Sequence, residues 1–103
     1  MEDRPVWVRM GSFRVVAGKL NELRRIYLEE CVPIVKAAEG NLDCCLLEST
    51  TDEDAIVAWT VWQTEQHATD YEMSGTAQAV VARVRHLFAG PPALQSFRIR
   101  RGV

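Results

Sequence analysis

The chain has 103 residues, of which 48% are hydrophobic and 25% charged, and its formal net charge is −2. These values are typical of a globular domain, exclude disordered and collagen-like classes, and leave no basic field to hold a nucleic acid. No apolar run can span a bilayer, and residues 1–5 begin no signal peptide. We therefore expect one soluble, cytoplasmic domain over residues 1–103, without nucleic-acid or membrane partners.

The first half of the chain reads as a strand followed by a helix. Val6–Val16 is predicted to be a strand, in which Gly11 marks a bulge or a close approach to the backbone. Apolar residues then recur at spacings of three and four, as on one face of a helix: Leu20, Leu23, Tyr27, Cys31, Ile34 and Ala38. Pro33 predicts a kink in this helix, and Gly40 its end.

Two further strands are predicted at Leu42–Ser49 and Ala55–Gln63, joined by a polar hairpin loop at residues 50–54. Nearly every position in both strands is apolar, without the alternation of a half-exposed sheet. This pattern is typical of a sheet that is covered on both faces.

The last third reads as a second helix and a final strand. Thr64 is the predicted N-cap, Ser74-Gly75 divides the helix, and Gly90-Pro91-Pro92 ends it. Its apolar stripe comprises Ala68, Tyr71, Ala77, Val80, Val81, Val84, Leu87 and Phe88. Leu94–Arg101 alternates apolar and polar residues, so we expect a strand with one polar side.

The order βαββαβ predicts an α+β, ferredoxin-like fold, with a four-stranded antiparallel sheet and both helices on one face. No part of the chain is left to cover the other face. The simplest cover is a second copy of the chain, so we expect a homodimer formed through the sheet faces, a dimeric α+β barrel.

The three cysteines do not suggest a disulfide framework. Their number is odd, and Cys44 and Cys45 are adjacent on a predicted strand, so their side chains point to opposite faces and share no metal. Cys31 lies on the apolar helix stripe. We interpret all three as buried structural thiols, with a reactive nucleophile as the alternative.

Several short motifs resemble the antibiotic biosynthesis monooxygenase family of dimeric α+β barrels. They are the Ala17-Gly18-Lys19 turn, the Glu39-Gly40 turn, the strand end Trp62-Gln63-Thr64-Glu65 and the Ser74-Gly75 break. The resemblance spans nearly the whole chain. It implies a cofactor-independent, metal-free monooxygenase that oxidises an aromatic polyphenol or quinol with molecular oxygen, because a deprotonated polyphenol can itself give an electron to oxygen. One fold hosts many functions, so an isomerase or a non-catalytic ligand-binding or structural dimer is the alternative.

The chain departs from the family pattern at three positions. Tyr71 stands where many members carry a His. Haem-degrading relatives have a His and an Asn at the positions of Val80 and Gly11, so the resemblance does not extend to haem degradation.

Aromatic residues and one serine are the candidate site residues. Tyr71 is either a core aromatic or a catalytic hydrogen-bond donor or proton relay to a phenolate. Trp59 and Trp62 are three apart on a strand and point to opposite faces; core packing is the default for both, and the resemblance makes Trp62 a pocket wall. We take both as candidate substrate-binding residues, together with Ser74, which either binds a ligand or caps the second half-helix. Trp7 is a candidate for the dimer interface.

The remaining polar candidates have plainer interpretations. His67 is either a solvated surface residue or a general base, and neither His67 nor His86 has partners at metal-ligand spacing. Arg98, Arg100 and Arg101 form a basic cluster that could orient an anion, although a solvated strand end is the default. We therefore expect no metal site, and the resemblance implies no cofactor and a small aromatic compound as substrate.

Overall fold

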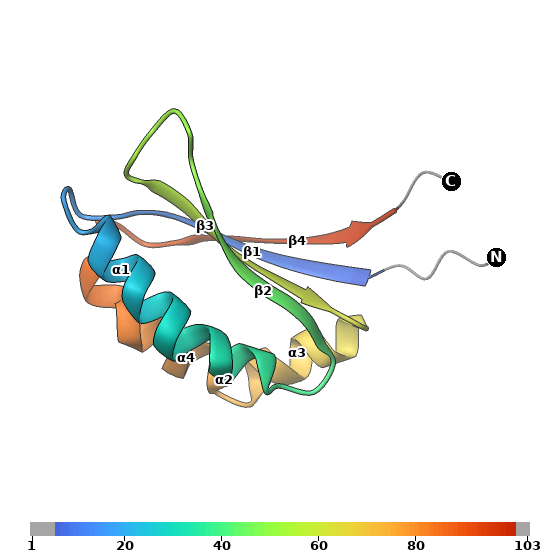
Figure 1. The fold of residues 1–103 in the computed structure, drawn as a ribbon. Helices are drawn as coiled ribbons and strands as arrows, with labels where there is room; N and C mark the ends of the chain where they lie inside the picture. The colour runs from blue at the N-terminus through green and yellow to red at the C-terminus, as the bar shows by residue number, and fades with distance from the viewer. Residues whose placement is uncertain (1–5, 101–103) are drawn as a thin grey trace.

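The computed structural model describes residues 6–100 and forms a two-layer α+β structure (Figure 1). The strands are β1 (Val6–Arg14), β2 (Asn41–Glu48), β3 (Ala55–Trp62) and β4 (Ala93–Ile99). They pair antiparallel in the order β2-β3-β1-β4, and the helices cover one face. The predicted ferredoxin-like fold is confirmed. Arg101 and the N-terminal residues 1–5 lie outside the described residues.

The helical layer consists of two broken helices. The first comprises α1 (Leu20–Ile26), the π-helical turn η1 (Tyr27–Cys31) and α2 (Val32–Lys36). The second comprises α3 (Glu65–Met73), α4 (Thr76–Val84) and the 3-10 turn η2 (Arg85–Leu87). None of the helices between residues 6 and 100 is both long and apolar enough to cross a membrane.

The π-helical turn lies directly before the proline, where a kink was expected. Pro33 lacks the N–H that an α-helix needs, and the wider turn ends with the N–H of Val32 donating to the carbonyl of Tyr27, five residues back. The extra residue moves the buried stripe by one position. Val35 is therefore buried and Ile34 only half-buried, contrary to the predicted stripe.

The second helix begins and breaks where the sequence predicts. The hydroxyl of Thr64 accepts a hydrogen bond from the N–H of His67, and Gly75 has a φ of +88°, which separates α3 from α4. It ends earlier than predicted, because α4 stops at Val84 and the 3-10 turn η2 that continues it stops at Leu87, before Gly90. Phe88 instead forms a β-bridge with Val15 and its ring lies 4.0 Å from that of Phe13, which draws the chain back to the sheet.

The only register shift in the described sheet lies in β2, between Asn41 and Asp43. The bulge predicted at Gly11 is wrong, since β1 pairs without interruption with both neighbours. A Cβ added to Gly11 would lie 3.4 Å from Leu94, an ordinary contact, so no close approach requires the glycine.

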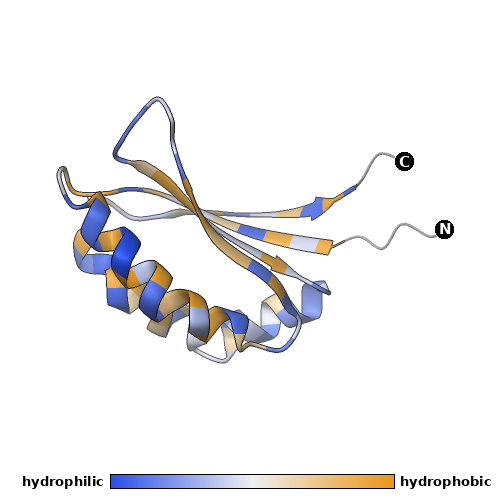
Figure 2. Cartoon of the chain, viewed as in Figure 1, coloured by the Kyte–Doolittle hydropathy of each residue, from blue (hydrophilic) through white to orange (hydrophobic). Residues whose placement is uncertain are grey.

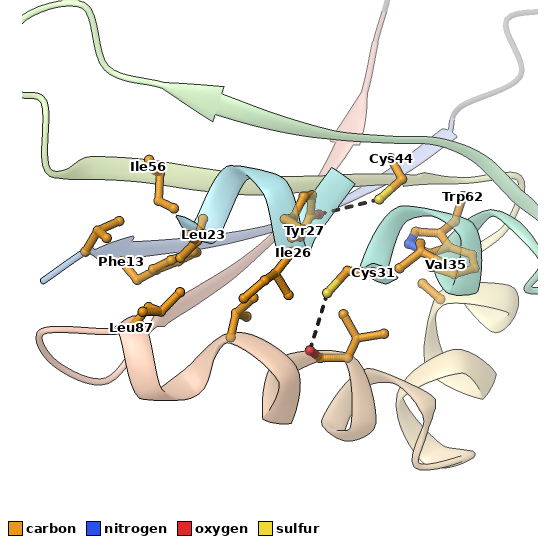
Figure 3. Packing of buried hydrophobic residues seen from close by; sticks show 14 residues of the cluster. Phe13, Leu23, Ile26, Tyr27, Cys31, Val35, Cys44, Ile56, Trp62 and Leu87 are labelled. Atoms are coloured by element: carbon orange, nitrogen blue, oxygen red, sulfur yellow. Dashed lines mark hydrogen bonds between the residues drawn. The ribbon is translucent and has the colours of Figure 1, made fainter. Parts of the chain in front are cut away.

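The core lies between the sheet and the helices (Figure 3). Trp62 and Leu23 are fully buried there, with Phe13 and Ile56 contributed by the central strands. Figure 2 shows runs of hydrophobic residues along the strands, whereas hydrophobic and hydrophilic residues are interspersed on the helices. The inner layer is therefore a conventional hydrophobic core.

The opposite face of the sheet, here called the outer face, is also apolar. By strand register it carries Met10, Val57, Trp59, Val61, Cys45, Leu47 and Phe97, most of them half-buried or exposed. Val8 and Val61 are buried on this face although they do not belong to the main core cluster. No helix of residues 6–100 covers it (Figure 1).

Candidate functional site

A cavity of about 560 Å³ lies between the inner face of the sheet and the second helix. It forms because α4 packs mainly against the first helix and leaves β4 uncovered. Leu94 on β4 is therefore 76% exposed although it points into the cavity. The walls are mostly apolar and include Phe13, Val80 and Val84. Such a space suits a small, largely apolar ligand.

Tyr71 lies on α3 and lines this cavity. No described residue forms a hydrogen bond with its hydroxyl, so the O–H is available to a ligand. Burial raises the pKa of the Tyr71 hydroxyl. At neutral pH the group is therefore protonated and can donate a hydrogen bond, but it is a poor proton acceptor.

Trp62 lies behind the cavity and contacts two of its lining residues. Its ring centroid is 4.8 Å from that of Tyr71, and its indole Nε1–H donates to the Thr60 hydroxyl at 2.9 Å. Tyr71 and Thr60 both line the cavity, whereas Trp62 is fully buried and does not itself reach the surface of the space. Trp62 therefore contacts two residues of the lining without belonging to the lining itself.

The other two predicted substrate contacts lie away from the cavity surface. Trp59 pairs with Met10 and Cys45 on the outer face, so Trp59 and Trp62 do point to opposite faces. Ser74 is exposed and its hydroxyl donates to the carbonyl of Tyr71 at 2.8 Å. Ser74 therefore caps the C-terminus of α3 by bonding to the Tyr71 carbonyl.

Several polar residues of the cavity were not singled out from the sequence, and three of them are linked to one another. They are Arg9 on β1, Thr60 on β3 and Glu72 on α3. Arg9 and Thr60 are directly opposite each other in the sheet register, and Arg9 forms an ion pair with Glu72. A signal was present, because Arg9 and Thr60 are polar residues at inward positions of strands that are otherwise apolar.

The tyrosine on the first helix also reaches the cavity, but its hydroxyl is occupied. Tyr27 Oη lies 3.5 Å from the Sγ of Cys44, and burial raises the pKa of Tyr27. Cys31 donates to the carbonyl of Val80 at 3.7 Å, and burial raises its pKa to about 11 (Figure 3). Among the described residues all three cysteines are free thiols; Cys31 and Cys44 are buried as predicted, whereas Cys45 on the outer face is only half-buried, contrary to the prediction.

The histidines stand apart from the cavity. Nδ1 of His67 is 2.8 Å from the Thr64 hydroxyl, its Nε2 is 4.0 Å from Glu39, and its ring packs on Gly40. His86 is exposed. Within residues 6–100 no three His, Cys, Asp or Glu side chains gather closely enough to hold a metal ion.

Gly11 and Val80, the positions assigned from the sequence to an Asn and a His of haem-degrading relatives, are both part of the cavity. Neither side chain offers a metal ligand. Arg98, from the predicted basic cluster, lies 4.6 Å over the ring of Trp7 in a cation–π contact. At least one member of that cluster therefore has a structural partner.

The strand order and the helices on one face define a ferredoxin-like α+β domain, with a cavity between the sheet and the second helix. The model of the antibiotic biosynthesis monooxygenase family matches residues 7–83. The chain belongs to this family. No curated protein matches it.

Solved structures extend the likeness to almost the whole chain. A variant of SnoaB, a cofactor-independent oxygenase from Streptomyces nogalater, aligns with a TM-score of 0.79 at 15% identity and covers 98% of each chain. A protein from Bordetella bronchiseptica named after the same family has a TM-score of 0.77 at 19% identity, covering 95% of this chain and 97% of its own. A conserved protein from Methanosarcina mazei has a TM-score of 0.75 at 11% identity, covering 94% and 95%. At these identities the likeness establishes the fold alone.

Proposed function

We propose that the chain is a cofactor-independent oxygenase that oxidises a small hydroxyaromatic compound, of the polyphenol or quinol type, in the cavity beside Tyr71. The observation that carries this proposal is a mainly apolar cavity into which a protonated tyrosine hydroxyl, without a partner among the described residues, can donate. Family membership supports an oxygenase in general, and the SnoaB structure is named as a cofactor-independent one.

The proposed chemistry needs little from the protein beyond binding and electrostatics. An ionised naphthol can give an electron to oxygen. One oxygen atom then replaces a ring hydrogen and becomes a quinone carbonyl, and the other leaves as water, so all electrons come from the ligand. Tyr71 would donate a hydrogen bond to the ligand oxygen on which negative charge develops. The apolar walls would keep water from that oxygen.

Direct contacts of Trp59, Trp62 and Ser74 with the substrate stay predictions, since none of the three lines the cavity in one copy of the chain. Ser74 would act by holding the end of α3. Trp62 would act through Tyr71 and Thr60.

We further propose that two copies pair through their outer faces. Helices cover only the inner face, and the outer face carries large apolar side chains, among them Trp59 and Phe97. Exposed apolar surface of this extent is a mark of an interaction site. We place the dimer in the cytoplasm, where three free thiols would stay reduced.

Oxygen uptake and quinone absorbance test the catalytic proposal. The purified, metal-stripped protein is compared with a heat-denatured control over a panel of naphthols, anthrones and hydroquinones. We expect uptake that survives chelators, and Tyr71→Phe should lower kcat by roughly tenfold to a hundredfold, because one donor to a developing oxyanion is lost. Unchanged turnover in a folded Tyr71→Phe protein would remove Tyr71 from the mechanism.

The same panel of compounds distinguishes the oxygenase from the alternative, a non-catalytic ligand-binding or structural dimer. A ligand-binding protein without chemistry would be stabilised by quinols in a concentration-dependent way and would consume no oxygen. A purely structural dimer would show neither effect.

A further inference from the structure

The cavity contains an ion pair that the proposed role of Tyr71 does not use. Arg9 projects from β1 and Glu72 from the last turn of α3, so the pair joins the sheet to the helix across the cavity wall. The side chains are 28% and 40% exposed, respectively. Both are thus accessible to a small molecule and only partly screened by solvent.

Each partner has hydrogen-bonding capacity left over. A guanidinium carries five N–H groups, and among the described residues Arg9 uses only one Nη1–H, on Oε1 of Glu72. The second carboxylate oxygen, Oε2, has no partner among those residues. A ligand oxygen at this place could therefore meet a donor and an acceptor at once.

Glu72 is the only carboxylate among the described residues that line the cavity. The other charged or titratable groups on the lining are Arg9 from β1, Tyr27 from the first helix, Tyr71 from α3 and Arg85 from η2. None of these is a ready proton acceptor at neutral pH, and no described residue of the lining is a histidine. If a proton leaves the ligand for a group of the protein, Glu72 is the group that can take it.

The neighbours of this pair are donors. Thr60 lies opposite Arg9 in the sheet, and its hydroxyl already accepts the indole N–H of Trp62, which leaves its own proton free for a ligand. Tyr71 precedes Glu72 on α3 and is a donor for the reason given above. Three donors around a single base suit a ligand hydroxyl that loses its proton and then needs its negative charge stabilised.

We propose that Glu72 is the general base of the site and that Arg9 pairs with the phenolate it produces. The ligand O–H bond breaks, its electron pair stays on the ligand oxygen, and the proton forms a new O–H bond on the Glu72 carboxylate. Arg9 then pairs with the phenolate in place of the neutralised Glu72 carboxylate, so the net charge of the cavity does not change. This limits the electrostatic cost of the proton transfer in a partly desolvated space. This inference rests on the proposed function and names the residues that activate its substrate.

Turnover of alpha-naphthol tests the base. Glu72→Gln keeps an oxygen for Arg9 but cannot accept a proton, so kcat/KM at neutral pH should fall by roughly a hundredfold. The loss should disappear at a pH at which the naphthol is already ionised, because no base is then needed. Glu30→Gln is the matched control: it removes a similarly exposed carboxylate, which pairs with Arg83 at 2.8 Å outside the cavity.

Binding of para-nitrophenolate tests the pairing without relying on turnover. Equilibrium dialysis is carried out without oxygen, at a pH at which the probe is ionised. Glu72→Gln should bind it about fivefold more tightly, because Arg9 is no longer neutralised, and Arg9→Met about fivefold more weakly. Glu30→Gln should match the wild type.

The two arms fail separately. Unchanged neutral-pH turnover in Glu72→Gln would overturn the base, and unchanged para-nitrophenolate binding in both cavity variants, or no binding to the wild type, would overturn the pairing. If the wild type consumes no oxygen but shows the expected binding pattern, the proposed oxygenase function fails and the phenolate pairing is supported.

Discussion

Gly40 shows how tightly one residue can be constrained at the edge of this site. Its φ is +82°, which favours glycine, and a Cβ at this position would lie only 2.1 Å from Cγ of His67. The imidazole therefore packs directly on the backbone between α2 and β2. This contact ties the start of β2 to the first turn of α3, whose last turn carries Tyr71 and Glu72.

Replacing Gly40 by Ala should be much more damaging than the same change at Gly18. Both glycines have nearly the same positive φ, but nothing lies within 4 Å of a Cβ at Gly18. Gly18→Ala should lower the free energy of unfolding by about 1 kcal/mol, from backbone strain alone. Gly40→Ala should lower it by about 3 kcal/mol, because the ring must also move.

Urea denaturation of the two variants measures this difference. The control is His67→Gly, alone and combined with Gly40→Ala, because a Cβ at Gly40 would also lie 2.5 Å from the Cβ of His67, which alanine would keep. Measured against His67→Gly alone, the loss from adding Gly40→Ala should fall to that of Gly18→Ala. An added loss that is still about 3 kcal/mol would show that the contact with the His67 side chain is not the cause.

Sequence patterns identified some residues of the cavity and missed others for a physical reason. Tyr71 was singled out because it lies on the apolar stripe at the position where the resemblance places a His. Trp62, which lies behind the cavity, was singled out because the resemblance marks the strand end before the second helix. Arg9 and Glu72 are 63 residues apart in the chain. Arg9 is marked as a polar residue in a mostly apolar strand, but Glu72 looks like an ordinary surface charge until the fold brings the two together, so periodicity alone cannot identify the pair.

At the scale of elements, the first helix shows how a local irregularity defeats a regular pattern. In an uninterrupted α-helix, the face that carries Tyr27 and Cys31 continues through Ile34, which was therefore predicted to be buried. The π-helical turn adds a residue before Pro33 and brings Val35 to the core instead, 1% exposed. The strand order, the hairpin and the Gly75 break were predictable because each has a local signal, whereas a π turn has none beyond the proline.

Because of this shift of one position, we expect truncation of Val35 to destabilise the fold more than truncation of Ile34, the reverse of what the predicted stripe implies. Val35→Ala should lower the free energy of unfolding by about 2 kcal/mol, because it leaves a cavity in the core. Ile34→Ala removes more carbon atoms from a half-buried site and should cost only about 1 kcal/mol. Thermal or urea unfolding distinguishes the two, and a larger loss for Ile34→Ala would mean that the helix follows the uninterrupted α-helical phase in solution.

At the scale of the whole molecule, the two faces of the sheet have different consequences for function. The strands and helices that form the inner face could be predicted from local sequence patterns. The cavity could not, because it results from the separation of α4 from β4, a tertiary feature that no periodicity indicates. The outer face is apolar and has no cover among residues 6–100. The near-continuous apolar strands indicated a covered sheet, and one copy of the chain supplies only half of that cover.

A dimer formed through the outer faces should depend on Trp59, which lies in the middle of that face between Met10 and Cys45. Trp59→Lys would place a charge where the proposed partner packs, and burying an unpaired charge is costly, so sedimentation should show a monomer. Met73→Lys is the control, because Met73 is an exposed apolar residue on the helical layer and its variant should remain a dimer. If the wild type sediments as a monomer, or Trp59→Lys as a dimer, the outer face is not the interface. Because the cavity lies on the inner face, the monomeric variant should still bind para-nitrophenolate, which would separate the assembly of the molecule from the chemistry of its site.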